Sequence, residues 1–393
     1  MAHKLASAIF PPNLEVDVRK AVAALALSLL VVVFTGAESP YYPPAGEWAR
    51  KTPAEVGMDA ARLGDALEFM KAHETRSPAR DFSDQEIVNG KLLASMPTER
   101  AATNALIIRH GYIVGEFGDT LRPDPTYSVA KSMLSTVASI ALRTGLIPKL
   151  DDAVSNIVKD GGYDSPHNRL ITWRNHLQQE SEWEGEMWGK NANFIGPEAF
   201  GRAEMKPRAI EAPGEHYEYN DVRINRLSLS LLTLFKKPVP DVFRDEVMNP
   251  IGASSTWKWV PYTNAYVTID GKRMASVAGG TRWGGGMWIS TYDMARFGLL
   301  WERGGRWGDR QIVSPDYVKL ATTASKHGPD YGLLWWLNTT GKWTGLPTTA
   351  FEAQGQGGNI IMVDPTHDLV VVWRWSAQSQ EGFRKVVDSI TVQ

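Results

Sequence analysis

A serine and a lysine stand three residues apart at Ser128 and Lys131, where a proline-containing loop gives way to a helical pattern. A serine hydroxyl is a poor nucleophile at neutral pH, so a base must take its proton, and a nearby amine can do this. Residues three apart on a helix lie on the same face, which would bring the Lys131 amine to the Ser128 hydroxyl. The spacing therefore predicts nucleophilic catalysis by Ser128.

The same spacing occurs at Ser255 and Lys258, so the pair alone is a weak signal. No long amphipathic helix follows that second pair, and two tryptophans flank its lysine, so we interpret it as a chance match. After Ser128, by contrast, apolar residues recur at helical spacing until Gly145. The start of that helix would also favour negative charge that develops at Ser128.

The composition narrows the class of protein. The chain has 393 residues, of which 43% are hydrophobic, and this is enough for a large buried core. Lys and Arg number 42 against 44 for Asp and Glu, without a long basic run, which argues against nucleic acid as a partner. The absence of cysteine excludes thiol chemistry and disulfides. We expect neither a metal nor a cofactor.

The first 37 residues are predicted to be a signal peptide or an N-terminal anchor. Arg19 and Lys20 precede an apolar run from Ala21 to Phe34, and small residues follow up to Ala37. The run is too short for a comfortable membrane span. We therefore expect export to the periplasm or the medium, with cleavage near Ala37. The alternative is attachment to the membrane through an uncleaved segment 19–37.

The remaining chain, residues 45–393, is expected to form one domain of the α+β class with an antiparallel sheet. Strand patterns at 105–116, divided by a tight turn at His110-Gly111, and at 331–337, 359–363 and 369–375 enclose a middle part that is rich in helical patterns. We expect the sheet part from about 45–125 and 285–393, and the helical part from about 126–284. A cleft between two such parts is where a site would form. A first helix is predicted over 48–72.

Three further motifs follow the serine in order. Pro213-Gly214 precedes Tyr219-Asn220-Asp221, the glycine-rich segment 284–288 precedes a helix, and the glycine-rich turn 353–358 precedes a strand. With Ser128 and Lys131, this ordered set resembles the serine β-lactamase and penicillin-binding protein superfamily, in particular its class C-like branch. That branch also includes family VIII carboxylesterases, D-amino-acid peptidases and 6-aminohexanoate oligomer hydrolases. The resemblance runs from about Trp48 to the C-terminus.

The resemblance implies a β-lactamase/transpeptidase-like fold with an inserted helical region, and it assigns roles to residues. Ser128 would be the acylated nucleophile and Lys131 its partner. Tyr219 would be the second base and proton donor, with a phenol pKa lowered by the lysine. The backbone N–H groups of Ser128 and Gln356 would form the oxyanion hole. The residues expected to contact the substrate are Asp221, Trp183, Gln354 and Gly355.

Two positions depart from the pattern of that branch. Its tyrosine motif usually ends in asparagine, whereas here it ends in Asp221. Members that recognise penicillin carry lysine or histidine at the start of the third motif to hold the substrate carboxylate, and here that residue is Ala353. Without this cation, a β-lactam or a peptide C-terminus loses its electrostatic anchor. A neutral ester or amide is therefore the favoured substrate.

We predict a serine hydrolase that cleaves a small ester or amide through a Ser128 acyl-enzyme, with Lys131 and Tyr219 as proton shuttles. Two alternatives stay open: a β-lactamase or D-amino-acid peptidase, and a penicillin-binding or sensor-like module that is acylated without turnover. Two other features are interpreted as structural. The glycine cluster 279–286 is expected to serve close backbone packing, and the glutamates around Trp183 to be solvated loop charges.

Overall fold

The computed structural model describes residues 39–193 and 209–391, and from Tyr41 onward the chain forms one compact unit. The predicted signal segment 1–37 lies outside the described residues. Within 39–193 and 209–391, no helix is both long enough and apolar enough to cross a membrane.

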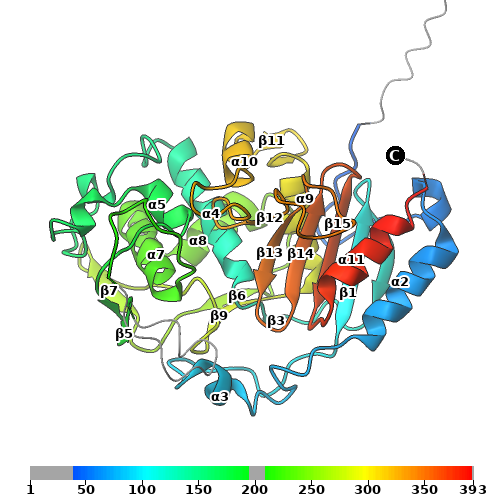
Figure 1. Ribbon diagram of the computed structural model, residues 1–393, viewed down its shortest axis with the longest axis horizontal. Coiled ribbons are helices and arrows are strands. Elements are labelled where there is room, and N and C mark those ends of the chain that lie inside the picture. The colour runs from blue at the N-terminus through cyan, green and yellow to red at the C-terminus, as the bar shows by residue number, and fades with distance from the viewer. Residues whose placement is uncertain (1–38, 194–208, 392–393) are drawn as a thin grey trace, which may run out of the picture. The chain divides into compact units, whose positions relative to one another are not determined.

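A six-stranded antiparallel sheet joins strands from the two ends of this unit (Figure 1). Its order is β12-β13-β14-β15-β1-β2, so the early strand β1 pairs with the last strand, β15. The predicted turn between β1 and β2 is confirmed, with positive φ angles at His110 and Gly111. The strands are β1 (Asn104–Arg109), β2 (Tyr112–Phe117), β12 (Trp336–Leu337), β13 (Phe351–Gly355), β14 (Asn359–Asp364) and β15 (Leu369–Arg374).

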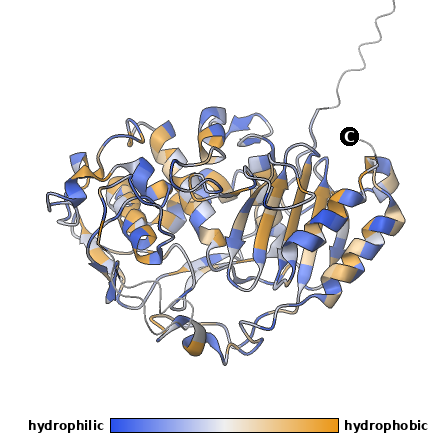
Figure 2. Ribbon diagram, in the orientation of Figure 1, coloured by the Kyte–Doolittle hydropathy of each residue, from blue (hydrophilic) through white to orange (hydrophobic). Residues whose placement is uncertain are grey.

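Both faces of the sheet are buried, which explains why its central strands read as continuous apolar runs. Successive residues of a strand point to opposite faces: Val370 and Val372 enter one core, and Val371 enters the other. Helices α2 (Ala60–Ala72) and α11 (Ser379–Asp388) lie side by side over the Val371 face (Figure 1). Helices α4 (Val129–Arg143) and α9 (Thr291–Glu302) cover the other face. Apolar residues accordingly fill the strands between the helices (Figure 2).

The helical part is built around α4, whose residues from Val129 to Ala141 are all buried. Helices α7 and α8 pack against it. The side chain of Asn220 accepts a hydrogen bond from Arg223 N at 2.9 Å and thereby caps the start of α7. The other described helices are α3 (Gln85–Asn89), α5 (Trp173–Leu177), α7 (Asp221–Phe235), α8 (Val239–Phe243) and α10 (Pro315–Ala321).

Smaller sheets complete the fold. One of them, in the order β3-β9-β6, supports the residues just before Ser128. The shorter strands are β3 (Asp124–Pro125), β4 (Glu186–Met187), β5 (Lys190–Asn191), β6 (Lys258–Val260), β7 (Tyr266–Ile269), β8 (Lys272–Ala275), β9 (Gly286–Ile289), β10 (Arg306–Trp307) and β11 (Arg310–Gln311). The mixture of helices with an antiparallel sheet confirms the predicted α+β class.

Two predicted elements are wrong in extent. The helix expected over 48–72 begins only at Ala60, because residues 53–56 form a separate 3₁₀ turn that ends at Gly57 with φ 69°. The strand expected over 331–337 is limited to Trp336–Leu337, since Leu334 adopts a positive φ of 61° that no regular strand accommodates.

Arg374 connects the large sheet by hydrogen bonds to the loop that precedes Ser128. Its buried guanidinium donates hydrogen bonds to Ile289 O (2.6 Å), Pro125 O (2.8 Å) and Asn359 Oδ1 (2.9 Å). We expect Arg374→Met to lower the free energy of unfolding by about 3 kcal/mol, because three buried acceptors lose their donor. Urea denaturation measures this change.

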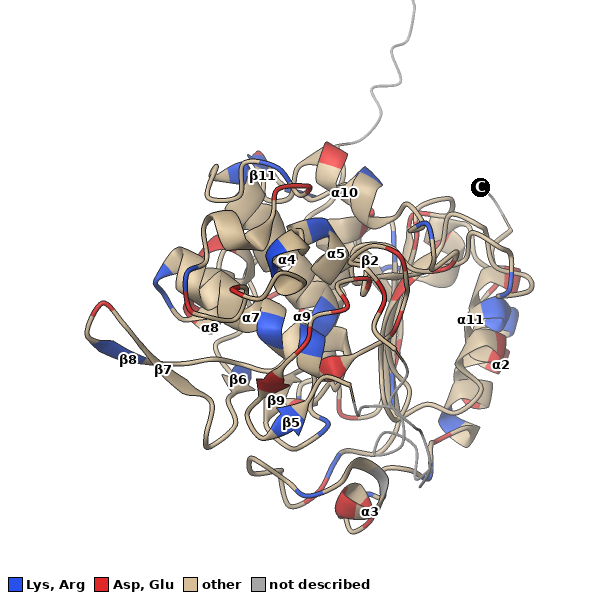
Figure 3. Ribbon diagram, turned by 60° about the vertical axis from the view of Figure 1, so that its left-hand side comes forward, with Lys and Arg blue, Asp and Glu red and all other residues tan. Residues whose placement is uncertain are grey.

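A charged residue on the outer side of α11 provides the control. Arg384 pairs with Glu381 and Asp388 among the charged residues of that helix (Figure 3). These exposed pairs contribute little to stability, so Arg384→Met should change the unfolding free energy far less. Equal effects of the two substitutions would contradict the role of Arg374.

Candidate active site

Ser128 lies at the junction of β3 and α4, directly before the first residue of the helix. Its neighbours hold this junction rigidly. Thr126 N donates to Met287 O at 2.9 Å, and the buried Tyr127 hydroxyl donates to Gln85 Oε1 at 2.6 Å. Tyr127 also has a positive φ of 52°, an uncommon backbone conformation of the kind that clusters at functional sites. The half-buried Ser128 is therefore presented by a fixed and locally strained turn.

The structure brings Lys131 to Ser128, as the spacing predicts. The Lys131 ammonium donates a hydrogen bond to Ser128 Oγ at 2.8 Å and a second, short one to the Asp221 carboxylate. It also lies 4.7 Å from the centre of the Tyr219 ring. Because Lys131 is only 1% exposed, these partners replace water around its charge.

Asp221 determines the protonation state of the Lys131 amine. Burial acts to lower the pKa of Lys131, but the Asp221 carboxylate outweighs it and the pKa is raised above its ordinary value. Burial likewise acts to raise the pKa of Asp221, yet Lys131 and then Arg282 hold it below its ordinary value. An Arg282 Nη1 lies 3.5 Å from Asp221 Oδ2. At neutral pH the site thus holds an ammonium and a carboxylate.

Tyr219 differs from the prediction in the direction of its pKa. Burial raises the pKa of the phenol, and although Lys131 acts to lower it, the net direction is upward. The predicted lowering is therefore wrong, because enclosure of the phenol outweighs the attraction of the ammonium. The enclosing rings include Trp336, stacked on Tyr219 at 5.4 Å between centroids, and Tyr331, edge-on at 6.1 Å. Tyr219 is a neutral hydrogen-bonding partner of Ser128 and Lys131.

The third motif reaches the serine through Gly355, the last residue of β13. A Cβ built on Gly355 would lie 2.0 Å from Thr126 O and 3.2 Å from Ser128 N. Only glycine therefore lets this strand pack against the loop that carries the nucleophile. Gln356 follows at the turn, and Gln354 precedes with its side-chain amide bonded to Glu352 Oε2 at 2.5 Å.

The glycine cluster serves close packing, as predicted, but one member also borders the site. A Cβ on Gly279, Gly284 or Gly286 would lie less than 2.5 Å from a neighbouring atom. A Cβ on Gly280 would instead lie 3.6 Å from both Ser128 Oγ and Lys131 Nζ, with only ordinary contacts. The backbone of Gly280 thus forms one wall beside the reacting hydroxyl.

The family model described as Beta-lactamase matches residues 124–388. The chain belongs to the beta-lactamase family. The matched region includes the serine, tyrosine and glycine-rich motifs, so the resemblance seen in the sequence is confirmed.

Three relatives of this beta-lactamase family chain are distant in sequence. One, from Escherichia coli O157:H7, bears the name "Putative D-alanyl-D-alanine carboxypeptidase" and is 23% identical over 194 residues, covering 41% of this chain and 45% of the relative. The chain thus spans less than half the length of that curated relative. A solved penicillin-binding protein homologue from Caulobacter crescentus is 14% identical, with a TM-score of 0.56 over 84% of this chain and 97% of the other.

A second solved structure, "EstCE1, a hydrolase with promiscuous acyltransferase activity", is 16% identical, with a TM-score of 0.55 over 84% of this chain and 99% of the other. At such identities the likeness shows the fold alone. It confirms the predicted β-lactamase/transpeptidase-like fold, which this beta-lactamase family member shares with the hydrolases of the family.

Two predicted features lie apart from the Ser128 group. Trp183 is buried, with its indole N–H donating to Gly162 O at 2.8 Å and its ring against Gly185. None of its described contacts reaches Ser128, Lys131 or Tyr219. The glutamates beside Trp183 are also not all solvated, because Glu182 is fully buried and pairs with Arg223 at 2.6 Å.

The second Ser-x-x-Lys pair is remote from chemistry of this kind. Lys258 lies on the short strand β6, where its ammonium sits 4.0 Å from the centre of the Trp288 ring.

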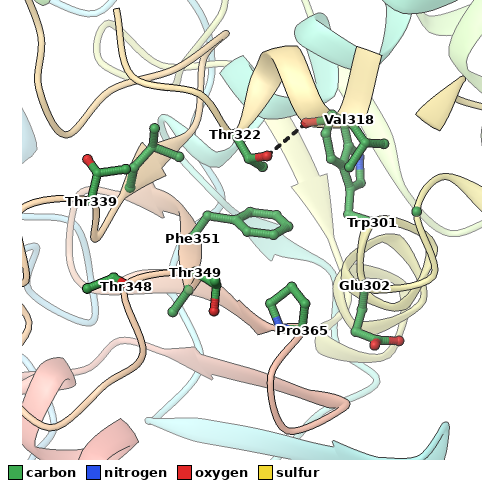
Figure 4. A pocket seen from close by; sticks show the side chains of 12 residues that line it. Trp301, Glu302, Val318, Thr322, Thr339, Thr348, Thr349, Phe351 and Pro365 are labelled. Atoms are coloured by element: carbon green, nitrogen blue, oxygen red, sulfur yellow. Dashed lines mark hydrogen bonds between the residues drawn. The ribbon is translucent and has the colours of Figure 1, made fainter. Parts of the chain in front are cut away.

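A cavity of about 430 Å³ lies between α9, α10 and β13, with the Phe351 ring pointing into it (Figure 4). Ser128, Lys131 and Tyr219 do not line that cavity. The candidate active site of this beta-lactamase family chain is therefore the Ser128 group.

Sequence reasoning missed three residues that border this group: Gly280, Arg282 and Trp336. The first two belong to the glycine cluster, whose density was the available signal, although it indicated packing alone. Trp336 comes from a short edge strand, and no motif marks it.

Proposed function

We propose that this protein is a serine hydrolase that cleaves a small ester or amide through an acyl-enzyme on Ser128. The observation that carries the proposal is the position of Lys131 Nζ, which contacts both Ser128 Oγ (2.8 Å) and the Asp221 carboxylate. The family and its hydrolase fold support this reading. Acyl transfer needs a nucleophile, a path for its proton and donors for the oxyanion, and the described residues offer each of these.

The donors for the oxyanion would be the backbone N–H groups of Ser128 and Gln356. Ser128 N lies at the start of α4, where N–H groups lack helical acceptors. Within residues 39–193 and 209–391, neither amide donates a hydrogen bond to a protein acceptor. The close approach of Gly355 to Ser128 N supports this pairing, because Gln356 directly follows Gly355 along the chain. A carbonyl oxygen placed there would gain two donors as its negative charge develops.

The proton of Ser128 would travel through Lys131. As Asp221 takes one proton from the ammonium, Lys131 Nζ can accept the proton of Ser128 Oγ, and the oxygen attacks the carbonyl carbon. Once it holds the Ser128 proton, Lys131 is again positively charged beside the oxyanion. The neutral Tyr219 phenol would then protonate the leaving oxygen or nitrogen and recover a proton from Lys131, while Asp221 returns its own. Water would release the acyl group by the same path in reverse.

The substrate class follows from what surrounds the serine. The third motif begins with the buried Ala353, so no cation from that position faces the substrate. Trp336 and Tyr331 add apolar ring surface beside Tyr219. These features support a small ester or amide whose reacting group is uncharged and that carries no carboxylate beside it.

Steady-state hydrolysis by residues 38–393 tests the proposal. We expect continuous multiple turnover of p-nitrophenyl acetate and butyrate, and no lasting mass adduct with benzylpenicillin. A stable penicillin adduct without ester turnover would overturn the proposal in favour of a penicillin-binding module. Rapid penicillin turnover with inert esters would favour a β-lactamase.

Asp221 supplies a sharp prediction, because asparagine is usual at this position in the branch that the sequence resembles. We expect Asp221→Asn to lower kcat for p-nitrophenyl butyrate by roughly 10²-fold, since the proton acceptor behind Lys131 is lost. Asp293→Asn is the matched control. That buried carboxylate, in the first turn of α9, binds Ser254 instead. Unchanged activity in Asp221→Asn would remove Asp221 from the proton path.

A further inference from the structure

Three polar side chains meet beside the third motif. The Glu352 carboxylate accepts hydrogen bonds from Gln354 Nε2 at 2.5 Å and from Gln380 Nε2 at 3.1 and 3.2 Å. Glu352 is fully buried, whereas Gln354 and Gln380 are partly exposed. We call Glu352, Gln354 and Gln380 the acceptor cluster.

The acceptor cluster is linked to the reacting centre through β13 and β12. Gln354 directly precedes Gly355, whose Cβ would lie 3.2 Å from Ser128 N, while the side chains of Glu352 and Gln354 point to the other side of β13. Trp336, the cross-strand partner of Glu352, stacks on Tyr219. Gln380 belongs to the first turn of α11. The acceptor cluster thus lies between β13 and the start of α11, and Trp336 connects it to Tyr219 of the Ser128 group.

The hydrogen bonds fix which atoms this cluster can offer to a ligand. An ionised carboxylate only accepts, so both glutamine NH₂ groups must turn toward Glu352, and both carbonyl oxygens turn away from it. Gln380 Oε1 is buried and has no hydrogen-bond partner among the described residues. A buried hydrogen-bond acceptor without a donor is energetically unfavourable. A ligand that supplies a donor to Gln380 Oε1 would remove this unfavourable state.

The charge at the cluster is negative when Glu352 is ionised. Burial raises the pKa of Glu352 to about 7, while Gln354, Gln380 and Lys342 act in the opposite direction. The Lys342 ammonium lies 3.3 Å from Asp330, so its charge is already matched. A ligand group that donates hydrogen bonds and carries positive charge would complement both the carbonyl oxygens and the carboxylate.

We propose that the acceptor cluster binds an amino group of the substrate, so that the preferred substrates are small esters or amides that carry an ammonium a few atoms from the scissile carbonyl. This inference rests on the proposed function of Ser128. The same negative cluster disfavours a substrate carboxylate, in line with the alanine at the start of the third motif.

Two series of matched esters test the proposal at about pH 8, where a carboxyl of pKa about 7 is ionised. One series varies the alcohol: 3-(dimethylamino)propyl, 4-methylpentyl and 3-carboxypropyl acetate. The other varies the acyl group: methyl 4-(dimethylamino)butanoate, methyl 5-methylhexanoate and monomethyl glutarate. In at least one series, we expect kcat/KM for the amino ester to exceed that of the uncharged ester by about tenfold, with the carboxylate ester poorest.

Substitutions within the acceptor cluster test whether the cluster causes the preference for the amino ester. Glu352→Gln keeps the shape of the side chain and should remove the preference by lowering kcat/KM for the amino ester. Gln354→Met should reduce it as well, which guards against a folding defect in the first variant. Glu381→Gln is the control, because that carboxylate lies on α11 but pairs with Arg384.

The outcomes separate the two proposals. Turnover that depends on Ser128 but shows no preference for the amino ester in either series would overturn the amino-group site alone. A preference that persists in Glu352→Gln and Gln354→Met would also overturn it. Failure of the protein to hydrolyse any of these six esters or the p-nitrophenyl esters would overturn the proposed function and, with it, this inference.

Discussion

Replacement of Ser128 by alanine is expected to lower kcat/KM for p-nitrophenyl butyrate by roughly 10⁴-fold or more. The substitution removes the hydroxyl oxygen that Lys131 Nζ contacts at 2.8 Å, and with it the atom that would carry the acyl group. The helix should be unaffected, because alanine is a good helix former and the Ser128 side chain makes no capping bond. Initial-rate measurements over a range of ester concentrations give the change.

Ser132→Ala is the matched control for this substitution. Ser132 lies one turn further along α4, where its hydroxyl donates to Leu334 O at 2.7 Å and is buried away from solvent. We expect its kcat/KM to stay within a few-fold of the native value. Retention of a tenth or more of the activity in Ser128→Ala would contradict the assignment of the nucleophile.

Replacement of Lys131 by methionine is expected to lower kcat by roughly 10³-fold. Methionine fills similar space but offers neither a proton path nor a positive charge beside the oxyanion. The rate of fluorophosphonate labelling of Ser128 should fall in parallel, because activation of the hydroxyl is common to both reactions. Stopped assays of ester hydrolysis and of labelling measure the two effects.

A double variant separates catalysis from stability at this position. Lys131→Met leaves the partly buried Asp221 with Arg282 as its remaining charged partner, which we expect to cost about 1–3 kcal/mol. Lys131→Met combined with Asp221→Asn removes the carboxylate charge that has lost its nearest partner, so thermal stability should largely return. Activity should not return. Recovery of activity in the double variant would mean that Lys131 acts only by stabilising the fold.

Local sequence patterns were sufficient to predict the elements nearest to Ser128. The helix after Ser128 and the contact between Ser128 and Lys131 follow from spacing, because both depend on residues one turn apart. The β1–β2 hairpin follows from alternation and a glycine turn. The place of Tyr219, 88 residues beyond Lys131, came only from the ordered motifs and the family resemblance. Spacing along the chain says nothing about a partner so far away.

Properties that depend on long-range packing could not be predicted. The pKa of Tyr219 is raised because rings from residues 331 and 336 enclose it, and no local signal reports enclosure. Glu182 is buried rather than solvated because Arg223 of α7 folds against it. Arg282 approaches Asp221 through the turns of the glycine cluster. In each case the partner comes from an element that is distant in sequence.

Acylation of Ser128 can be observed by peptide mapping with mass spectrometry. The reaction is quenched with acid during turnover of a slow ester, such as p-nitrophenyl trimethylacetate. We predict an added mass of one acyl group on the peptide that contains Ser128, which disappears as the ester is consumed and is absent from Ser128→Ala. An acyl group on another residue, or the same adduct in Ser128→Ala, would contradict the central claim that Ser128 is the acylated nucleophile.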